Sequence, residues 1–108
     1  MILSIDLGKT SCRAAGGGRR VEGAGAPGLA APGGVRAAEA AILAVVNQFG
    51  PVEELIVGAA GALTAPEAAH ALGAALLGSL RVKRVTVTSD GVIAHADAKT
   101  QLAPADSR

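Results

Sequence analysis

The chain has almost no aromatic residues. Among its 108 residues Phe49 is the only phenylalanine, and there is no tyrosine or tryptophan. Proteins that hold single-stranded nucleic acid stack the bases on aromatic rings, and this chain has no set of rings for that purpose. It also lacks an excess of charge, since ten Lys and Arg against nine Asp and Glu leave a net charge of +1. We therefore expect neither nucleic acid nor an anionic membrane as a partner.

The chain also has little cysteine, no features of a signal peptide and no long apolar run. Cys12 is the only cysteine, which excludes an intramolecular disulfide and a cysteine-based zinc or iron–sulfur site. We predict that it is a small buried hydrophobe rather than a reactive thiol. The longest apolar stretch is interrupted by Asn47 and Gln48 before it reaches the length of a membrane span. Met1 precedes an apolar strand without the basic segment of a signal peptide, so we expect a cytoplasmic protein.

What the sequence does contain is an alternation of strand and helix patterns. Half of the residues are apolar, and the length suits one domain around one hydrophobic core. Period-2 and short apolar runs predict strands, and apolar residues at helical spacing predict helices. The predicted strands are 2–7, 11–15, 19–25, 54–60 and 81–89, and the predicted helices are 35–49, 65–80 with Thr64 as the N-cap, and 92–98.

This order of elements predicts an α/β fold with a mixed sheet. The first three strands form an antiparallel meander, whereas strands that alternate with helices pair in parallel. A sheet with the first and fifth strands near its middle satisfies both conditions. Ligands of such sheets bind beyond the carboxyl ends of the strands, so residues at those ends are the candidates for chemistry.

The first ten residues carry the clearest local signal. A buried strand ends near Asp6, Gly8 opens a turn, and Lys9, Thr10 and Ser11 follow as donors. A carboxylate for hydrated Mg²⁺, free backbone N–H groups and a hydroxyl are typical of a phosphate site. Asp, Gly, Thr and Ser are also common in plain hairpin turns, so these residues alone leave both interpretations open.

A second carboxylate, Asp90, ends the fifth predicted strand. If that strand lies near the first, Asp6 can hold Mg²⁺ through water while Asp90 accepts a proton from an alcohol, as phosphoryl transfer requires. Asp90 can equally be the N-cap of the helix that follows. The small residues 58–62 leave the fourth strand at the same edge, where they allow close approach of either a ligand or a packed helix. His70 and His95 are predicted within helices and are not expected to be ligands.

Taken together, these motifs resemble a known superfamily. The run Asp6–Leu7–Gly8–Lys9–Thr10–Ser11 after a buried strand resembles the first phosphate motif of the sugar kinase, actin and heat-shock chaperone superfamily. The βββαβαβα order resembles the ribonuclease-H-like (actin-like) domain of that superfamily. The chain is most similar there to bacterial N-acetylglucosamine and glucosamine kinases and to the activator ATPases of benzoyl-CoA reductase. Three further segments fit this likeness, at residues 25–28, 57–61 and 87–90.

The resemblance implies that residues 1–98 are the N-terminal lobe of such an ATPase, followed by a frayed tail at 99–108. A complete enzyme would transfer the γ-phosphoryl group of ATP to a sugar hydroxyl, with ATP and Mg²⁺ as cofactors. The residue roles that it implies are Asp90 as catalytic base, Asp6 for the metal, Gly8, Lys9 and Thr10 for the ATP phosphates, and Gly28, Gly61 and Ser89 for the substrate.

The chain also departs from the kinase pattern. Leu29 and Ser89 stand where these kinases usually carry asparagine, so the identity of the sugar is left open. The second phosphate motif and the adenosine motif of the superfamily belong to another lobe. We therefore expect a C-terminal lobe or a homodimer partner, and little kinase activity from these residues alone. A lobe of an activator-type ATPase and a non-enzymatic domain of the same fold are the alternatives.

Overall fold

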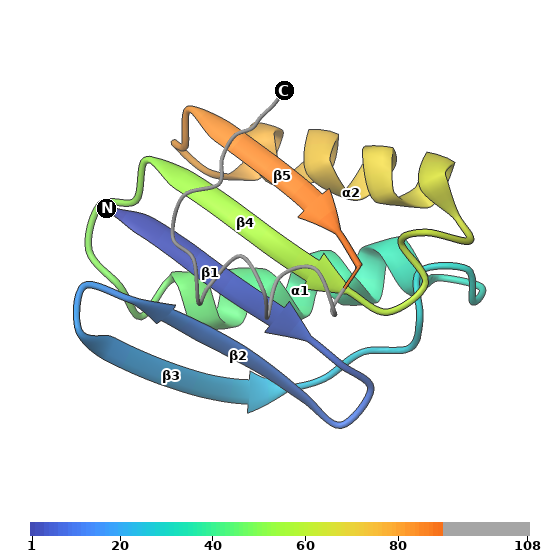
Figure 1. Cartoon of the computed structure of the whole chain (residues 1–108), viewed down its shortest axis with the longest axis horizontal. Helices are drawn as coiled ribbons and strands as arrows, with labels where there is room; N and C mark the ends of the chain where they lie inside the picture. Colours follow the sequence, from blue (N-terminus) through green and yellow to red (C-terminus); the bar gives the residue numbers. More distant parts are fainter. Residues whose placement is uncertain (90–108) are drawn as a thin grey trace.

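The computed structural model describes residues 1–89, which form five strands and two helices (Figure 1). The predicted helix 92–98, the tail 99–108, Asp90 and His95 lie outside the described residues. The elements are β1 (Ile2–Leu7), β2 (Ser11–Gly16), β3 (Arg19–Ala24), α1 (Gly34–Val46), β4 (Glu54–Ala59), α2 (Pro66–Ser79) and β5 (Arg84–Thr88).

The five strands form one mixed sheet with the order β3-β2-β1-β4-β5. β1 and β3 each pair antiparallel with β2, whereas β4 pairs in parallel with both β1 and β5. This confirms the predicted α/β class, and the βββαβαβ order with this sheet is consistent with a ribonuclease-H-like topology.

The expected position of the fifth strand is wrong. β1 is the middle strand of the sheet, but β5 is an edge strand, separated from β1 by β4. The burial of β4 and the composition of β5 are compatible with this arrangement. β4 is buried along most of its length, as an interior strand requires, whereas β5 alternates valine with arginine or threonine and suits an edge.

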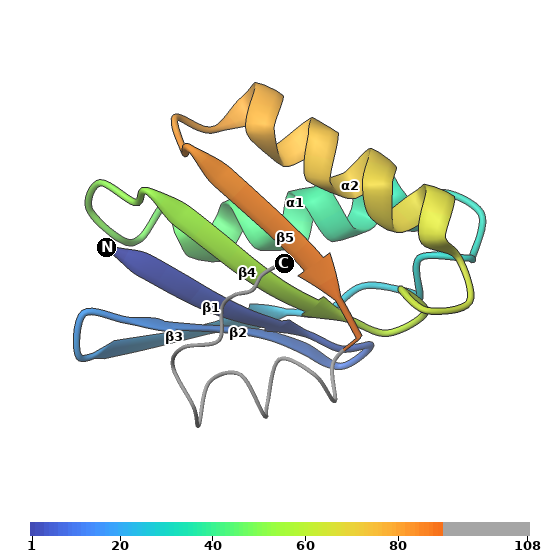
Figure 2. The ribbon, with the colours of Figure 1, turned by 45° about the horizontal axis from the view of Figure 1, so that its top comes forward.

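Both helices cover the same face of the sheet (Figure 2). The two parallel crossovers, β1 to β4 and β4 to β5, step outward in the same direction, and crossovers of one hand then place their helices on one side. On this face, the apolar side chains of alternate strand residues pack against the apolar sides of α1 and α2. The fully buried large side chains of this core are Leu3, Ile5, Ile42, Val45, Leu55, Val57, Leu72 and Leu76. We call the other side of the sheet the open face, because no described helix covers it.

The helix ends differ slightly from the predicted ones. α1 ends at Val46 rather than Phe49, and the chain leaves it through two turn residues. The N-cap of α2 is Ala65, and the prediction of Thr64 in that role is wrong. The Thr64 hydroxyl instead donates a hydrogen bond to the Gly61 carbonyl, at 3.3 Å, and so closes the loop before the helix.

β5 is also shorter than predicted, starting at Arg84 instead of residue 81. The backbone N–H groups of Lys83 and Arg84 both donate to the Glu53 carbonyl, at 2.7 and 3.3 Å, where the chain joins the sheet. Within residues 1–89 no helix has the length and apolar character needed to cross a membrane.

Candidate functional site

The candidate site lies at the edge of the sheet where the parallel strands end. β1, β4 and β5 run in the same direction, so their carboxyl ends share one edge, at the right of Figure 1. Three described segments follow or border these ends: the turn 8–10, the loop 25–33 and the loop 60–65. Backbone hydrogen bonds join the loop 25–33 to each of the other two segments.

The turn 8–10 joins β1 to β2 and is open to solvent. The Gly8 N–H donates to the Ser11 carbonyl at 2.9 Å, whereas the N–H groups of Lys9 and Thr10 make no hydrogen bond within the described residues. A Cβ atom at Gly8 would have its nearest neighbour, the Ser11 carbonyl oxygen, at an ordinary 3.6 Å. Neither packing nor backbone conformation therefore requires glycine at this position.

The loop 25–33 is hydrogen-bonded to this turn and packs closely against it. The Ala26 N–H donates to the Gly8 carbonyl at 3.0 Å. A Cβ atom at Gly25 would collide with the Gly8 carbonyl oxygen and would lie 2.6 Å from the Lys9 carbonyl oxygen. Glycine is thus required at position 25 because two backbones approach each other there.

The same loop also contacts the segment that follows β4. The Leu29 N–H donates to the Ala60 carbonyl at 3.2 Å, and Gly61 has a φ of +89°, which disfavours any other residue. A Cβ atom at Gly28 would lie 3.8 Å from the Ala60 carbonyl oxygen, so Gly28 and the segment 60–61 are neighbours. The structure therefore brings the turn, Gly28 and Gly61 to one edge.

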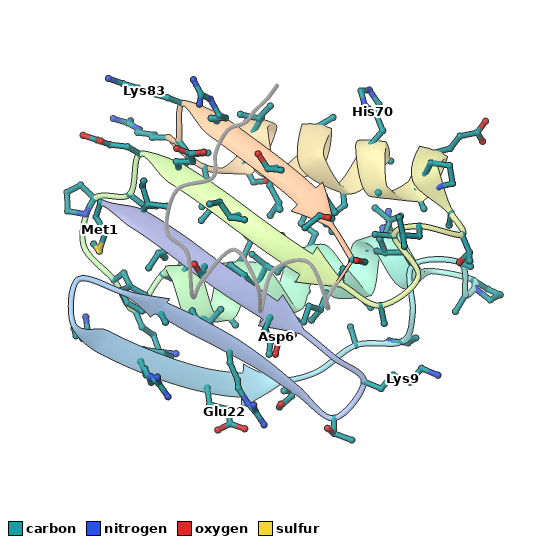
Figure 3. All side chains as sticks on the ribbon, in the orientation of Figure 1. Met1, Asp6, Lys9, Glu22, His70 and Lys83 are labelled. Carbon is teal, nitrogen blue, oxygen red and sulfur yellow. The ribbon has the colours of Figure 1, made fainter. Side chains whose placement is uncertain are left out.

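Ser89 follows β5 at this edge and is partly buried. It is separated from β1 by β4, because β5 is the outer strand. Asp90, the predicted catalytic base, lies outside the described residues. His70 is exposed on α2, and its side chain points away from the sheet (Figure 3).

Asp6 is on the open face near the end of β1 and is exposed (Figure 3). Its neighbours across the sheet are Arg13 on β2 and Gly58 on β4, with Thr88 beyond Gly58. Within residues 1–89 the carboxylate of Asp6 has no hydrogen-bond or ion-pair partner.

This carboxylate fits one kind of metal site. In the described part of the chain no group of three or more His, Cys, Asp or Glu side chains can enclose a metal ion. Mg²⁺ is usually held by one or two carboxylates together with water and substrate phosphates, rather than by an all-protein cage. A single free carboxylate beside an open turn, as at Asp6 and Gly8, suits that mode of binding.

Cys12 lies on the helix-covered face and is fully buried. Burial first, and the nearby charge of Asp6 second, raise the pKa of its thiol from 9.0 to about 11. The thiol is therefore neutral at physiological pH and has no access to solvent, which confirms the prediction of a small buried hydrophobe.

Two features of this region were not predicted from the sequence. One is the contact of Gly25 with the turn, which depends on tertiary structure. The other is the ion pair between Arg13 Nε and Glu22 Oε2, at 3.9 Å, on the open face. The tight turn at Gly17 and Gly18 sets the register that pairs these two residues, so hairpin geometry offered a signal for the second.

No protein-family model, curated protein or solved structure matches the chain. The fold assignment therefore rests on the arrangement of the strands and helices themselves.

Proposed function

We propose that this chain is the N-terminal lobe of an ATP-dependent sugar kinase, amino sugars included, which transfers the γ-phosphoryl group to a sugar hydroxyl. One observation supports the proposal most. The open turn 8–10, the carboxylate of Asp6 and the glycine loops at positions 28 and 61 lie at the edge where the parallel strands end. This is the edge at which ligands bind in sheets of this type.

The turn 8–10 has the properties of a phosphate site. The N–H groups of Lys9 and Thr10 make no hydrogen bond within residues 1–89. Together with the exposed Lys9 ammonium and Thr10 hydroxyl, they are donors suited to phosphate oxygens. Gly8 leaves the backbone accessible although the fold itself tolerates a side chain there. A glycine that the fold does not need is what close approach of a ligand would require.

Asp6 is the residue that would hold Mg²⁺, through its exposed carboxylate and bound water. The ion would supply positive charge to the phosphate oxygens during transfer. In the reaction the sugar hydroxyl oxygen bonds to the γ-phosphorus, the bond to the β-phosphate oxygen breaks, and ADP leaves. The resemblance assigns the hydroxyl proton to the carboxylate of Asp90. Gly28, Gly61 and Ser89 would border the sugar.

Binding of nucleotide to the whole 108-residue chain tests this proposal. We expect Mg·ATP to shift the backbone amide NMR signals of Lys9 and Thr10, because their N–H groups would donate to phosphate. D6N should reduce these shifts when Mg²⁺ is present, since it removes the negative charge that attracts the ion. Signals on α2, such as that of His70, provide the internal control. Absence of shifts at the turn would refute the proposal.

Turnover provides a second measurement. Under the proposal the adenosine and the second phosphate motif are contributed by another lobe. We expect the purified chain to bind nucleotide weakly and to show little or no phosphorylation of glucosamine or N-acetylglucosamine. Robust turnover by the 108 residues alone would contradict the assignment of the chain as one lobe of a two-lobed site.

A further inference from the structure

Three charged side chains stand in a row across the open face. Asp6 on β1 is in register with Arg13 on β2, and Arg13 is in register with Glu22 on β3. All three are exposed, and Figure 3 shows Asp6 and Glu22 on either side of β2. The charges alternate, so the single guanidinium of Arg13 lies between two carboxylates.

In the structure Arg13 pairs with Glu22 and not with Asp6. Arg13 Nε lies 3.9 Å from Glu22 Oε2. No ion pair joins Arg13 to Asp6 within the described residues, although the two residues are directly opposite each other. Side chains directly opposite on antiparallel strands are close enough to interact, so an Arg13–Asp6 pair is the available alternative.

The choice of partner matters for a cation at Asp6. A guanidinium on a carboxylate occupies its oxygens with N–H donors and places a positive charge where a metal ion would lie. With Arg13 directed to Glu22, no side chain of residues 1–89 occupies the oxygens of Asp6, and a divalent cation can bind them.

We infer that Glu22 is a positioning residue of the candidate cation site, which acts by keeping Arg13 away from Asp6. The inference rests on the proposed function, because it takes Asp6 as the carboxylate that faces Mg²⁺. Glu22 does not touch the ion, since two strand spacings put it about 10 Å from the position of Asp6. Glu22 affects cation binding only by holding the side chain of Arg13.

Mn²⁺ is a suitable probe, because it prefers the same oxygen ligands as Mg²⁺ and broadens nearby NMR signals. It is titrated into the full 108-residue chain as wild type, E22Q, R13Q, the E22Q/R13Q double variant and D6N. We expect E22Q to weaken Mn²⁺ binding at Asp6 about 2- to 5-fold, the range that a surface ion pair accounts for. Adding R13Q to E22Q should restore the affinity, and D6N should abolish the broadening at this site.

The double variant separates the role of Arg13 from the distant charge of Glu22. If E22Q weakens binding equally with and without Arg13, Glu22 acts by its own charge and the inference is overturned. If D6N abolishes binding while E22Q matches the wild type, the inference fails and the cation site stands. If the wild type shows no Asp6-dependent binding, both fail. Equal melting temperatures of the variants exclude unfolding as the cause.

Discussion

The two faces of the sheet differ although they are built from the same strands. On β1, Leu3 and Ile5 are fully buried beneath the helices, whereas Asp6, the next residue along the chain, is exposed on the open face. The helix-covered face consists of aliphatic side chains and one neutral thiol. The open face presents the charged row Asp6, Arg13 and Glu22.

This contrast separates stability from function within a single strand. Residues on the covered face are constrained by close packing, so a change of even one methylene group alters the stability of the fold. Exposed residues on the open face, such as Asp6, are not enclosed by the core, so we expect their substitution to leave the fold intact. The C-terminal edge combines both properties, because Gly25 is fixed by packing while Gly8, which it supports, is not.

The largest expected effect distinguishes neighbouring residues on the two faces. I5A removes a fully buried side chain and should lower the free energy of unfolding by about 2–5 kcal/mol. D6N, one residue away, should change it by no more than about 0.5 kcal/mol. Urea unfolding followed by circular dichroism measures both. Equal losses in the two variants would contradict the assignment of the two faces.

The thiol of Cys12 makes the covered face sensitive to alkaline pH. Its pKa is raised from 9.0 to about 11, so the folded state favours the neutral form. This stabilisation is fully present below pH 9 and is lost as the pH rises to about 11, because only the unfolded chain ionises freely in that window. The loss amounts to about 3 kcal/mol.

The matched control for this effect is C12A, which has no thiol to titrate. The two proteins differ only at position 12, so the difference in slope between wild type and C12A from pH 9 to 11 isolates Cys12. Parallel curves would show that the thiol ionises equally in both states. In the native protein at pH 7 we also expect Cys12 to be unreactive toward water-soluble thiol reagents.

The smallest expected effect on stability is the difference between alanine substitutions at two glycines of the candidate site. G25A introduces a methyl group against the backbone of Gly8 and Lys9 and should cost about 1–3 kcal/mol. G8A meets no close neighbour and should stay within about 0.5 kcal/mol of the wild type. Urea unfolding measures the difference, and G8A should reduce the Mg·ATP shifts at the turn despite its native stability. A G8A variant that is stable and shows the wild-type shifts would show that binding at the turn does not require glycine at position 8.

Local patterns predicted most of the elements correctly. The alternation in β1, the helical spacing of Ala38, Ile42 and Val45, and the strand of β4 all correspond to observed buried faces. These patterns succeed because burial on one side dictates a period of 2 or 3.6 in the sequence. The prediction of Thr64 as the N-cap was wrong because its hydroxyl donates a hydrogen bond to a loop carbonyl instead. Which partner the hydroxyl has depends on the conformation of the loop.

The candidate site was predictable only in part. The motif from Asp6 to Thr10 is contiguous in sequence, so its residue types were visible there, and its role stays a proposal. The contact of Gly25 with Lys9 and that of Leu29 with Ala60 join segments 16 and 31 positions apart, and no local rule encodes them.

By itself the sequence determined which residues face the core, where the turns occur and which fold class results, because these follow from local periodicity and backbone conformation. Tertiary structure alone decided that β5 occupies the edge and that both helices share one face. It also decided that Arg13 pairs with Glu22, whereas Asp6 has no ion-pair partner within residues 1–89. The physical reason is that these outcomes depend on strand order and on competition between partners, which is settled only when distant segments meet.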